Sequence, residues 1–182
     1  MDEQGDHHWW NDIHQGDAAE TLAEMPESSV HCVMTSPPYY GLRDYDVDGQ
    51  VGLENSLSEY IDTIVDVGDE LGRVLRNDGS WWLNLGDSFT SKRKQLVPHR
   101  VAIALQDAGW IVRADCVWSK SRPMPHPVKD RLNEHKEFVF HLTQSTDYWF
   151  DLDAVREPHS EASFARIESA KSSGKYTAGK QM

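Results

Sequence analysis

The chain has 182 residues, enough for one domain with a well-formed core and too few for two large ones. Hydrophobic residues make up 38% and charged residues 26%, which excludes a disordered or fibrous protein. No apolar run approaches the roughly 18 residues that a membrane span needs, and no secretory leader is visible. We therefore expect a cytoplasmic protein with no membrane partner.

The net charge of −12 is unevenly distributed, so it does not exclude a nucleic-acid partner. Residues 1–91 contain 19 acidic side chains, three Arg and no Lys. Residues 92–136 contain 10 basic side chains against 4 acidic ones. We expect this basic segment to face the phosphates of DNA.

The cysteines and histidines give no sign of a metal site. Cys32 and Cys116 are too few for a four-cysteine zinc site or a disulfide framework, and both lie in apolar runs. We expect both to be ordinary buried thiols. The histidines of the basic half are too irregularly spaced for a metal site, so we expect none.

Capping residues and apolar spacing predict strands that alternate with helices. Asp17 is suited to cap one helix, and Ser56 with Glu59 forms a capping box before the longest apolar repeat of helical spacing. The predicted strands are 11–16, a buried strand at 30–34, 80–85, 110–118, 137–143 and a short one at 148–150. The predicted helices begin at residues 17, 57 and 97 and end near residues 25, 76 and 108. This alternation implies an α/β fold with a largely parallel sheet.

The segment Thr35-Ser36-Pro37-Pro38-Tyr39 follows the predicted strand at 30–34, at the sheet edge where α/β proteins bind ligands. The prolines have no backbone N–H group, so the loop offers carbonyl acceptors. The Ser36 hydroxyl adds an acceptor, and Tyr39 supplies a flat face. Such a loop suits a planar ring with an amino group, which would donate to Ser36 and the Pro37 carbonyl. A structural turn with a packed tyrosine is the alternative for this motif taken by itself.

Several segments together resemble the amino-DNA methyltransferases of restriction-modification systems. In the family's order, the matching segments are Gly16-Asp17, 35–45, 52–54, 59–60, 73–79, 83–87 and 118–120. The Ser-Pro-Pro-Tyr form is typical of the cytosine-N4 branch, whereas a first residue Asp or Asn is typical of the adenine-N6 branch. The resemblance implies a Rossmann-like methyltransferase fold, S-adenosylmethionine as cofactor and double-stranded DNA as partner.

The resemblance also implies a reaction and its residues. A methyl group would pass from S-adenosylmethionine to N4 of a cytosine flipped out of the duplex. The implied catalytic residues are Ser36, Pro37, Pro38 and Tyr39, and the implied cofactor-binding residues are Asp17 and Thr35. The candidate DNA-binding residues are Arg43, Lys92, Arg93, Lys94, Lys120 and Arg122. Helix capping explains Asp17 equally well. Two other functions stay open: an adenine-N6 enzyme, and a silent remnant that binds DNA or a partner chain.

One family segment is missing from the sequence. The family holds its cofactor with a Phe-x-Gly-x-Gly loop, and no Gly-x-Gly occurs in these 182 residues. We therefore expect an incomplete fold, in which residues 11–157 are the amino-terminal, catalytic-motif portion of a methyltransferase domain. Residues 1–10 would be flexible and residues 158–182 a loose tail or linker. A truncated gene, half of a split enzyme and an incomplete reading frame all predict inactivity without a carboxyl-terminal half.

Overall fold

The computed structural model describes residues 9–172 and divides the chain into two units, 1–149 and 150–182. The expected end of the catalytic-motif portion at residue 157 stays a prediction. Of the amino-terminal segment expected to be flexible, residues 1–8 lie outside the described residues. Among residues 9–172, no helix combines the length and apolar character of a bilayer span.

A four-stranded sheet forms the centre of the first unit. Its strands are β1 (Val30–Thr35), β2 (Leu75–Leu85), β5 (Ile111–Ser119) and β6 (Lys136–Thr143), in the order β1-β2-β6-β5. β1 and β2 are parallel, whereas β6 is antiparallel to both β2 and β5. Strands β1, β2 and β5 therefore share one direction. The α/β fold is confirmed, with one reversed strand placed between two strands of common direction.

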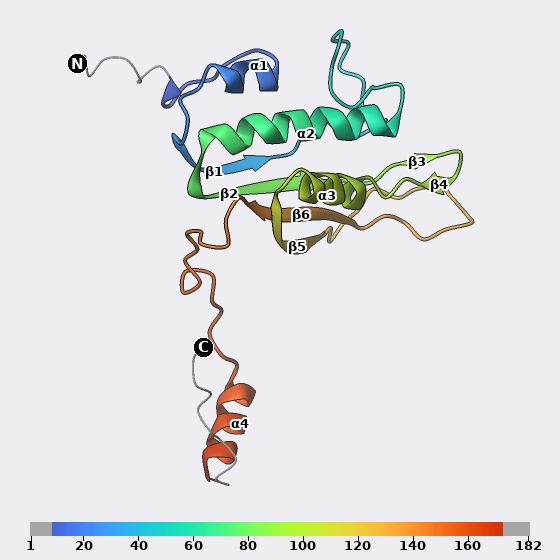
Figure 1. The fold of residues 1–182 in the computed structure, drawn as a ribbon. Coiled ribbons are helices and arrows are strands. Elements are labelled where there is room, and N and C mark those ends of the chain that lie inside the picture. Colours follow the sequence, from blue (N-terminus) through green and yellow to red (C-terminus); the bar gives the residue numbers. More distant parts are fainter. Residues whose placement is uncertain (1–8, 173–182) are drawn as a thin grey trace, which may run out of the picture. The chain divides into compact units, whose positions relative to one another are not determined.

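Helices α2 (Leu57–Val74) and α3 (Val97–Asp107) pack against each other and against one face of the sheet. The predicted cap of α2 is confirmed, because the Ser56 side chain accepts a hydrogen bond from the Glu59 N–H group. A short helix, α1 (Ala18–Ala23), lies on α2, as Figure 1 shows. The shared core of α2, α3 and the sheet includes Ile64, Leu71, Trp81, Leu83, Leu105 and Leu142, each 2% exposed or less.

Some predicted elements are wrong. Residues 11–16 form no strand, since Ile13 is 93% exposed and has no neighbouring strand to pair with. Residues 148–150 form no strand either. Part of the expected loose tail is a helix, α4 (Glu161–Ser172). This helix buries no side chain, so its sequence carries no apolar stripe from which it could have been predicted. A two-residue ladder of β3 (Phe89–Thr90) and β4 (Arg93–Lys94) was not predicted.

Strand β1 lies at the edge of the sheet and is not the buried strand expected from its apolar run. It pairs only with β2 among the described strands, and Met34 is 80% exposed. The prediction of buried thiols is also wrong, because Cys32 on β1 and Cys116 on β5 are both exposed. The strand registers place both thiols on the sheet face opposite α2 and α3. An apolar strand is buried only where both of its faces are covered.

Candidate active site

One edge of the sheet brings the catalytic motif together with three other strand ends. Ser36 follows β1, Asn84 lies near the end of β2, and Lys120 follows β5. Glu137 is the second residue of β6, and it reaches this edge because β6 runs in the opposite direction. A cavity of about 390 Å³ opens here. Its lining residues are Ser36, Pro37, Pro38, Tyr39, Leu42, Arg43, Tyr45, Lys120 and Glu137.

Tyr39 is held at both its ring and its hydroxyl group. The hydroxyl donates to Glu137 Oε2 at 2.8 Å and accepts from Asn84 Nδ2 at 2.8 Å, while Ser36 Oγ lies 3.4 Å from Tyr39 Oη. The ring lies against Gly86, where an added Cβ would come within 2.5 Å of the ring. Burial, together with the nearby Glu137 carboxylate, raises the pKa of Tyr39 to about 12. The phenol is therefore neutral at neutral pH.

The backbone of the proline loop leaves the Pro37 carbonyl available to a ligand. The Pro38 carbonyl accepts from the Tyr60 hydroxyl at 3.1 Å, and the Tyr39 carbonyl accepts from the Leu42 N–H group at 3.2 Å. The Pro37 carbonyl has no hydrogen-bond donor within residues 9–172. Pro37 also lines the cavity, so this oxygen can accept a hydrogen bond from a ligand there, and its contact with an amino group stays a prediction.

Glu137 and Lys120 form an ion pair in the same cavity. The Glu137 side chain is only 14% exposed. Burial pushes the pKa of Glu137 upward, but the Lys120 hydrogen bond, those from Asn84 and Tyr39, and the Lys120 charge outweigh it and hold the pKa below its usual range. Lys120 was predicted to contact DNA phosphates; the structure places it beside the catalytic motif. Glu137 and Asn84 were not predicted as site residues.

The other basic candidates lie away from this cavity, except Arg43, which lines it. Lys92 pairs with Asp130 at 3.0 Å, and Lys94 pairs with Glu134 at 2.6 Å. Arg93 and Arg122 are exposed. Within the basic cluster of Lys92, Arg93 and Lys94, both lysines thus have acidic partners in the loop between β5 and β6. Contact of the cluster with DNA stays a prediction.

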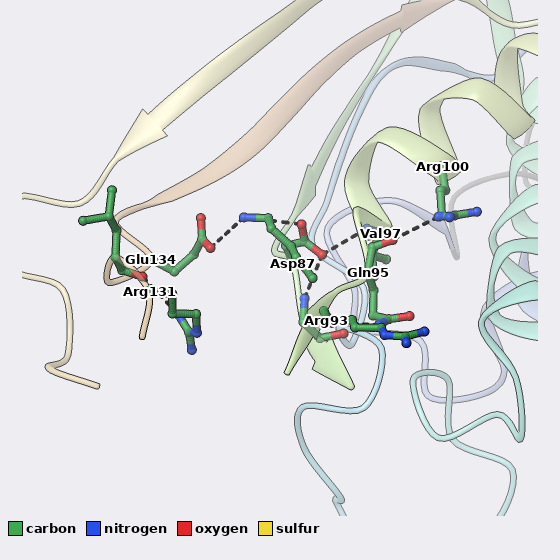
Figure 2. Close-up of polar contacts among 10 residues, drawn as sticks. Asp87, Arg93, Gln95, Val97, Arg100, Arg131 and Glu134 are labelled. Atoms are coloured by element: carbon green, nitrogen blue, oxygen red, sulfur yellow. Dashed lines mark hydrogen bonds and ion pairs between the residues drawn. The ribbon is translucent and has the colours of Figure 1, made fainter. Parts of the chain in front are cut away.

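Asp87 connects this basic region to α3. Its Oδ1 accepts from the Val97 N–H group at 3.1 Å (Figure 2). Its Oδ2 lies 3.6 Å from Lys94 Nζ. The residue at the usual cap position, Leu96, supplies no side-chain hydrogen bond. Asp87 therefore caps the amino end of α3 from outside the helix, which fixes the loop that follows β2.

The two cofactor candidates both have partners within the chain. Asp17 Oδ1 accepts from the N–H groups of Ala19 and Glu20 at 2.9 and 3.1 Å and so caps α1. Thr35 Oγ1 accepts from Trp81 Nε1 at 2.8 Å. Neither residue lines the cavity of the catalytic motif. The structure supplies a capping role and a packing role, and their contact with a cofactor stays a prediction.

Sequence comparisons identify related proteins. Residues 30–179 match the N6/N4 family model described as DNA methylase. M.Cfr9I, a type II methyltransferase of Citrobacter freundii, is 40% identical over 84% of this chain and 60% of its own length. M.SfiI, from Streptomyces fimbriatus, is 42% identical over 93% of this chain and 45% of its own length. The chain thus spans only about half the length of these relatives.

Solved structures show the same fold. The cytosine-N4-specific PvuII DNA methyltransferase superposes with a TM-score of 0.67 at 22% identity, covering 93% of this chain and 64% of that one. TTHA0409 of Thermus thermophilus, solved with S-adenosyl-L-methionine, has a TM-score of 0.59 at 26% identity, covering 85% and 64%. These likenesses confirm the Rossmann-like methyltransferase fold. The match of the family model over residues 30–179 establishes that the chain belongs to the N6/N4 DNA methylase family.

Proposed function

We propose that this chain carries the catalytic motif of an S-adenosylmethionine-dependent DNA methyltransferase that modifies N4 of cytosine. The observation that carries the proposal is the pair of acceptors in the cavity, the Ser36 hydroxyl and the unpartnered Pro37 carbonyl, beside the Tyr39 ring. A serine stands where the adenine-N6 branch has Asp or Asn. The cytosine-N4 specificity of the PvuII enzyme supports this choice of base.

The site residues would orient the amino group of a flipped cytosine. The N4 lone pair is delocalised into the ring, which makes the amine a poor nucleophile. Accepting its two hydrogens at Ser36 and the Pro37 carbonyl would turn the lone pair out of conjugation. Stacking on Tyr39 would offset part of the few kcal/mol that flipping costs. When bound, the cofactor supplies an already activated sulfonium methyl group, so positioning provides much of the remaining catalysis.

We propose that the cofactor is bound in full only when a carboxyl-terminal segment joins this chain. The sequence has no Gly-x-Gly, and Asp17 and Thr35 already have hydrogen-bond partners. Glycines would let the backbone approach the cofactor closely, which side chains obstruct. The test is calorimetric titration with S-adenosylmethionine and a tritium-transfer assay, first on the chain and then with a segment containing Phe-x-Gly-x-Gly. Micromolar binding and turnover by the 182 residues without that segment would overturn this part of the proposal.

Nucleoside analysis of the methylated DNA tests the base. N4-methylcytosine is expected from the assembled enzyme. N6-methyladenine would instead assign the chain to the adenine branch. DNA binding with no methylated base in any assembly would support the silent remnant.

A further inference from the structure

A row of polar contacts crosses the cavity from Lys120 to Ser36. The ammonium group of Lys120 contacts Glu137 Oε1. The other carboxylate oxygen, Oε2, accepts from the Tyr39 hydroxyl at 2.8 Å and from Asn84 Nδ2 at 3.0 Å. Tyr39 Oη in turn lies 3.4 Å from Ser36 Oγ. The proposed function uses Ser36 and Tyr39 but gives no part to Glu137.

The chemistry of these groups fixes which atom donates in each contact. An ionised carboxylate only accepts hydrogen bonds, whereas an ammonium group and an amide nitrogen only donate. The single hydroxyl hydrogen of Tyr39 is therefore committed to Glu137. Tyr39 Oη is left to accept, so the Ser36 hydroxyl hydrogen points toward Tyr39. Ser36 Oγ, which also lies 3.4 Å from the donor Asn84 Nδ2, then keeps a lone pair for a ligand in the cavity.

We propose that Glu137 is a positioning residue that sets this direction, so that Ser36 meets the amino group of the target base as an acceptor. This inference rests on the proposed function, because an amino group has hydrogens to donate. With Glu137 protonated or replaced, Tyr39 can turn its hydrogen toward Ser36. The Ser36 hydrogen would then face the amino hydrogens, donor against donor, and the amine would lose its alignment.

Lys120 supports the same arrangement by keeping Glu137 ionised. Its charge and hydrogen bond are among the influences that hold the pKa of Glu137 below its usual range, against the opposing influence of burial. The other charged or titratable groups that line the cavity are Arg43, Tyr39 and Tyr45. Tyr39 stays neutral across the acid range, and Glu137 is the one carboxylate among the residues that line the cavity.

The first test needs no enzymatic activity. Tyrosines in the 182-residue chain are replaced by 3-fluorotyrosine, which ionises at lower pH, and the Tyr39 resonance is assigned with Tyr39→Phe. Glu137→Gln should lower the pKa of residue 39, because the carboxylate opposes formation of a neighbouring phenolate. The control is Glu134→Gln, since Glu134 also pairs with a lysine but lies outside the cavity. An equal pKa in Glu137→Gln and Glu134→Gln would overturn the proposal.

The second test uses the enzyme assembled with its carboxyl-terminal segment. Glu137→Gln should lower kcat about 10- to 100-fold, the scale of a misplaced reacting group. Lys120→Gln should move the acid limb of the pH profile to higher pH, because the pKa of Glu137 rises. Glu137→Gln should add little to Tyr39→Phe, since it acts through the Tyr39 hydroxyl. Additive losses, or an unmoved acid limb, would contradict the assigned role. A wild-type enzyme that methylates no cytosine refutes the proposed function, while the fluorine titration still decides whether Glu137 holds Tyr39.

Discussion

Gly86 determines where the Tyr39 ring lies, and replacing it with alanine tests how closely that position matters. An added Cβ would lie 2.5 Å from Tyr39 Cε2 and 2.6 Å from Cδ2. Carbon atoms in contact prefer about 3.5–4.0 Å, so the ring must move by roughly 1 Å. Overpacking of this kind costs about 1–3 kcal/mol of stability. A displacement of about 1 Å at a reacting group can cost on the order of 100-fold in rate.

The measurement combines thermal unfolding of the chain with methyl transfer by the assembled enzyme. Gly72→Ala in α2 is the matched control, because the one close contact of its Cβ would be with the amide end of the flexible Gln144 side chain, at 2.9 Å, and the next atom, on Trp110, lies at an ordinary 3.8 Å. Adding Tyr39→Ala to Gly86→Ala removes the clash, so the double variant should unfold at no lower temperature than Tyr39→Ala. A Gly86→Ala protein with wild-type stability and activity would refute the reasoning.

Three further outcomes are expected. Tyr39→Ala should lower methylation about 5- to 150-fold, because it removes roughly 1–3 kcal/mol of stacking on the base. Tyr39→Phe should retain more activity than Tyr39→Ala. Full activity of Tyr39→Ala would exclude stacking on the base. Changing Lys92, Arg93 and Lys94 to Ala should reduce the slope of log affinity for duplex DNA against log salt by less than about 2.7, the value for three phosphate contacts, because both lysines already pair with carboxylates. Fluorescence anisotropy measures this slope. An unchanged slope would show that these three residues make no phosphate contact. Burial, and after it the Arg113 charge, lower the pKa of His141, so the unfolded chain binds a proton at higher pH than the folded chain does. The free energy of unfolding should therefore fall as the pH drops from about 6.5 through the folded-state pKa of His141. Urea unfolding across this range should show a smaller fall for His141→Gln.

The parts of the fold that depend on neighbouring residues could be predicted from the sequence. Asp17 and Ser56 both cap helices as expected, since a cap involves groups only two or three residues apart. The proline loop of Ser36 to Tyr39 also lies at the carboxyl end of β1, as predicted. Each of these features is decided by local spacing and backbone chemistry.

The parts that depend on strand order could not be predicted in this way. Glu137 belongs to the site only because β6 is antiparallel and begins where β1, β2 and β5 end. The apolar run of β1 indicated a buried strand, yet its burial is decided by which segments cover it. Sequence spacing carries no information about the direction of β6 or about which segments cover β1. The one available signal was for Asn84, which lies inside the family-like segment 83–87.

The sheet face opposite α2 and α3 gives the protein a chemical reporter of its own. Cys32 and Cys116 are its only cysteines, and they lie on that face in the two edge strands, β1 and β5. A maleimide should alkylate both in the chain by itself. If the carboxyl-terminal segment proposed above covers the whole face, it should slow both reactions, whereas a segment that pairs only along β1 should slow the reaction of Cys32. The ratio of the two alkylation rates therefore distinguishes these two modes of assembly in the unmodified protein.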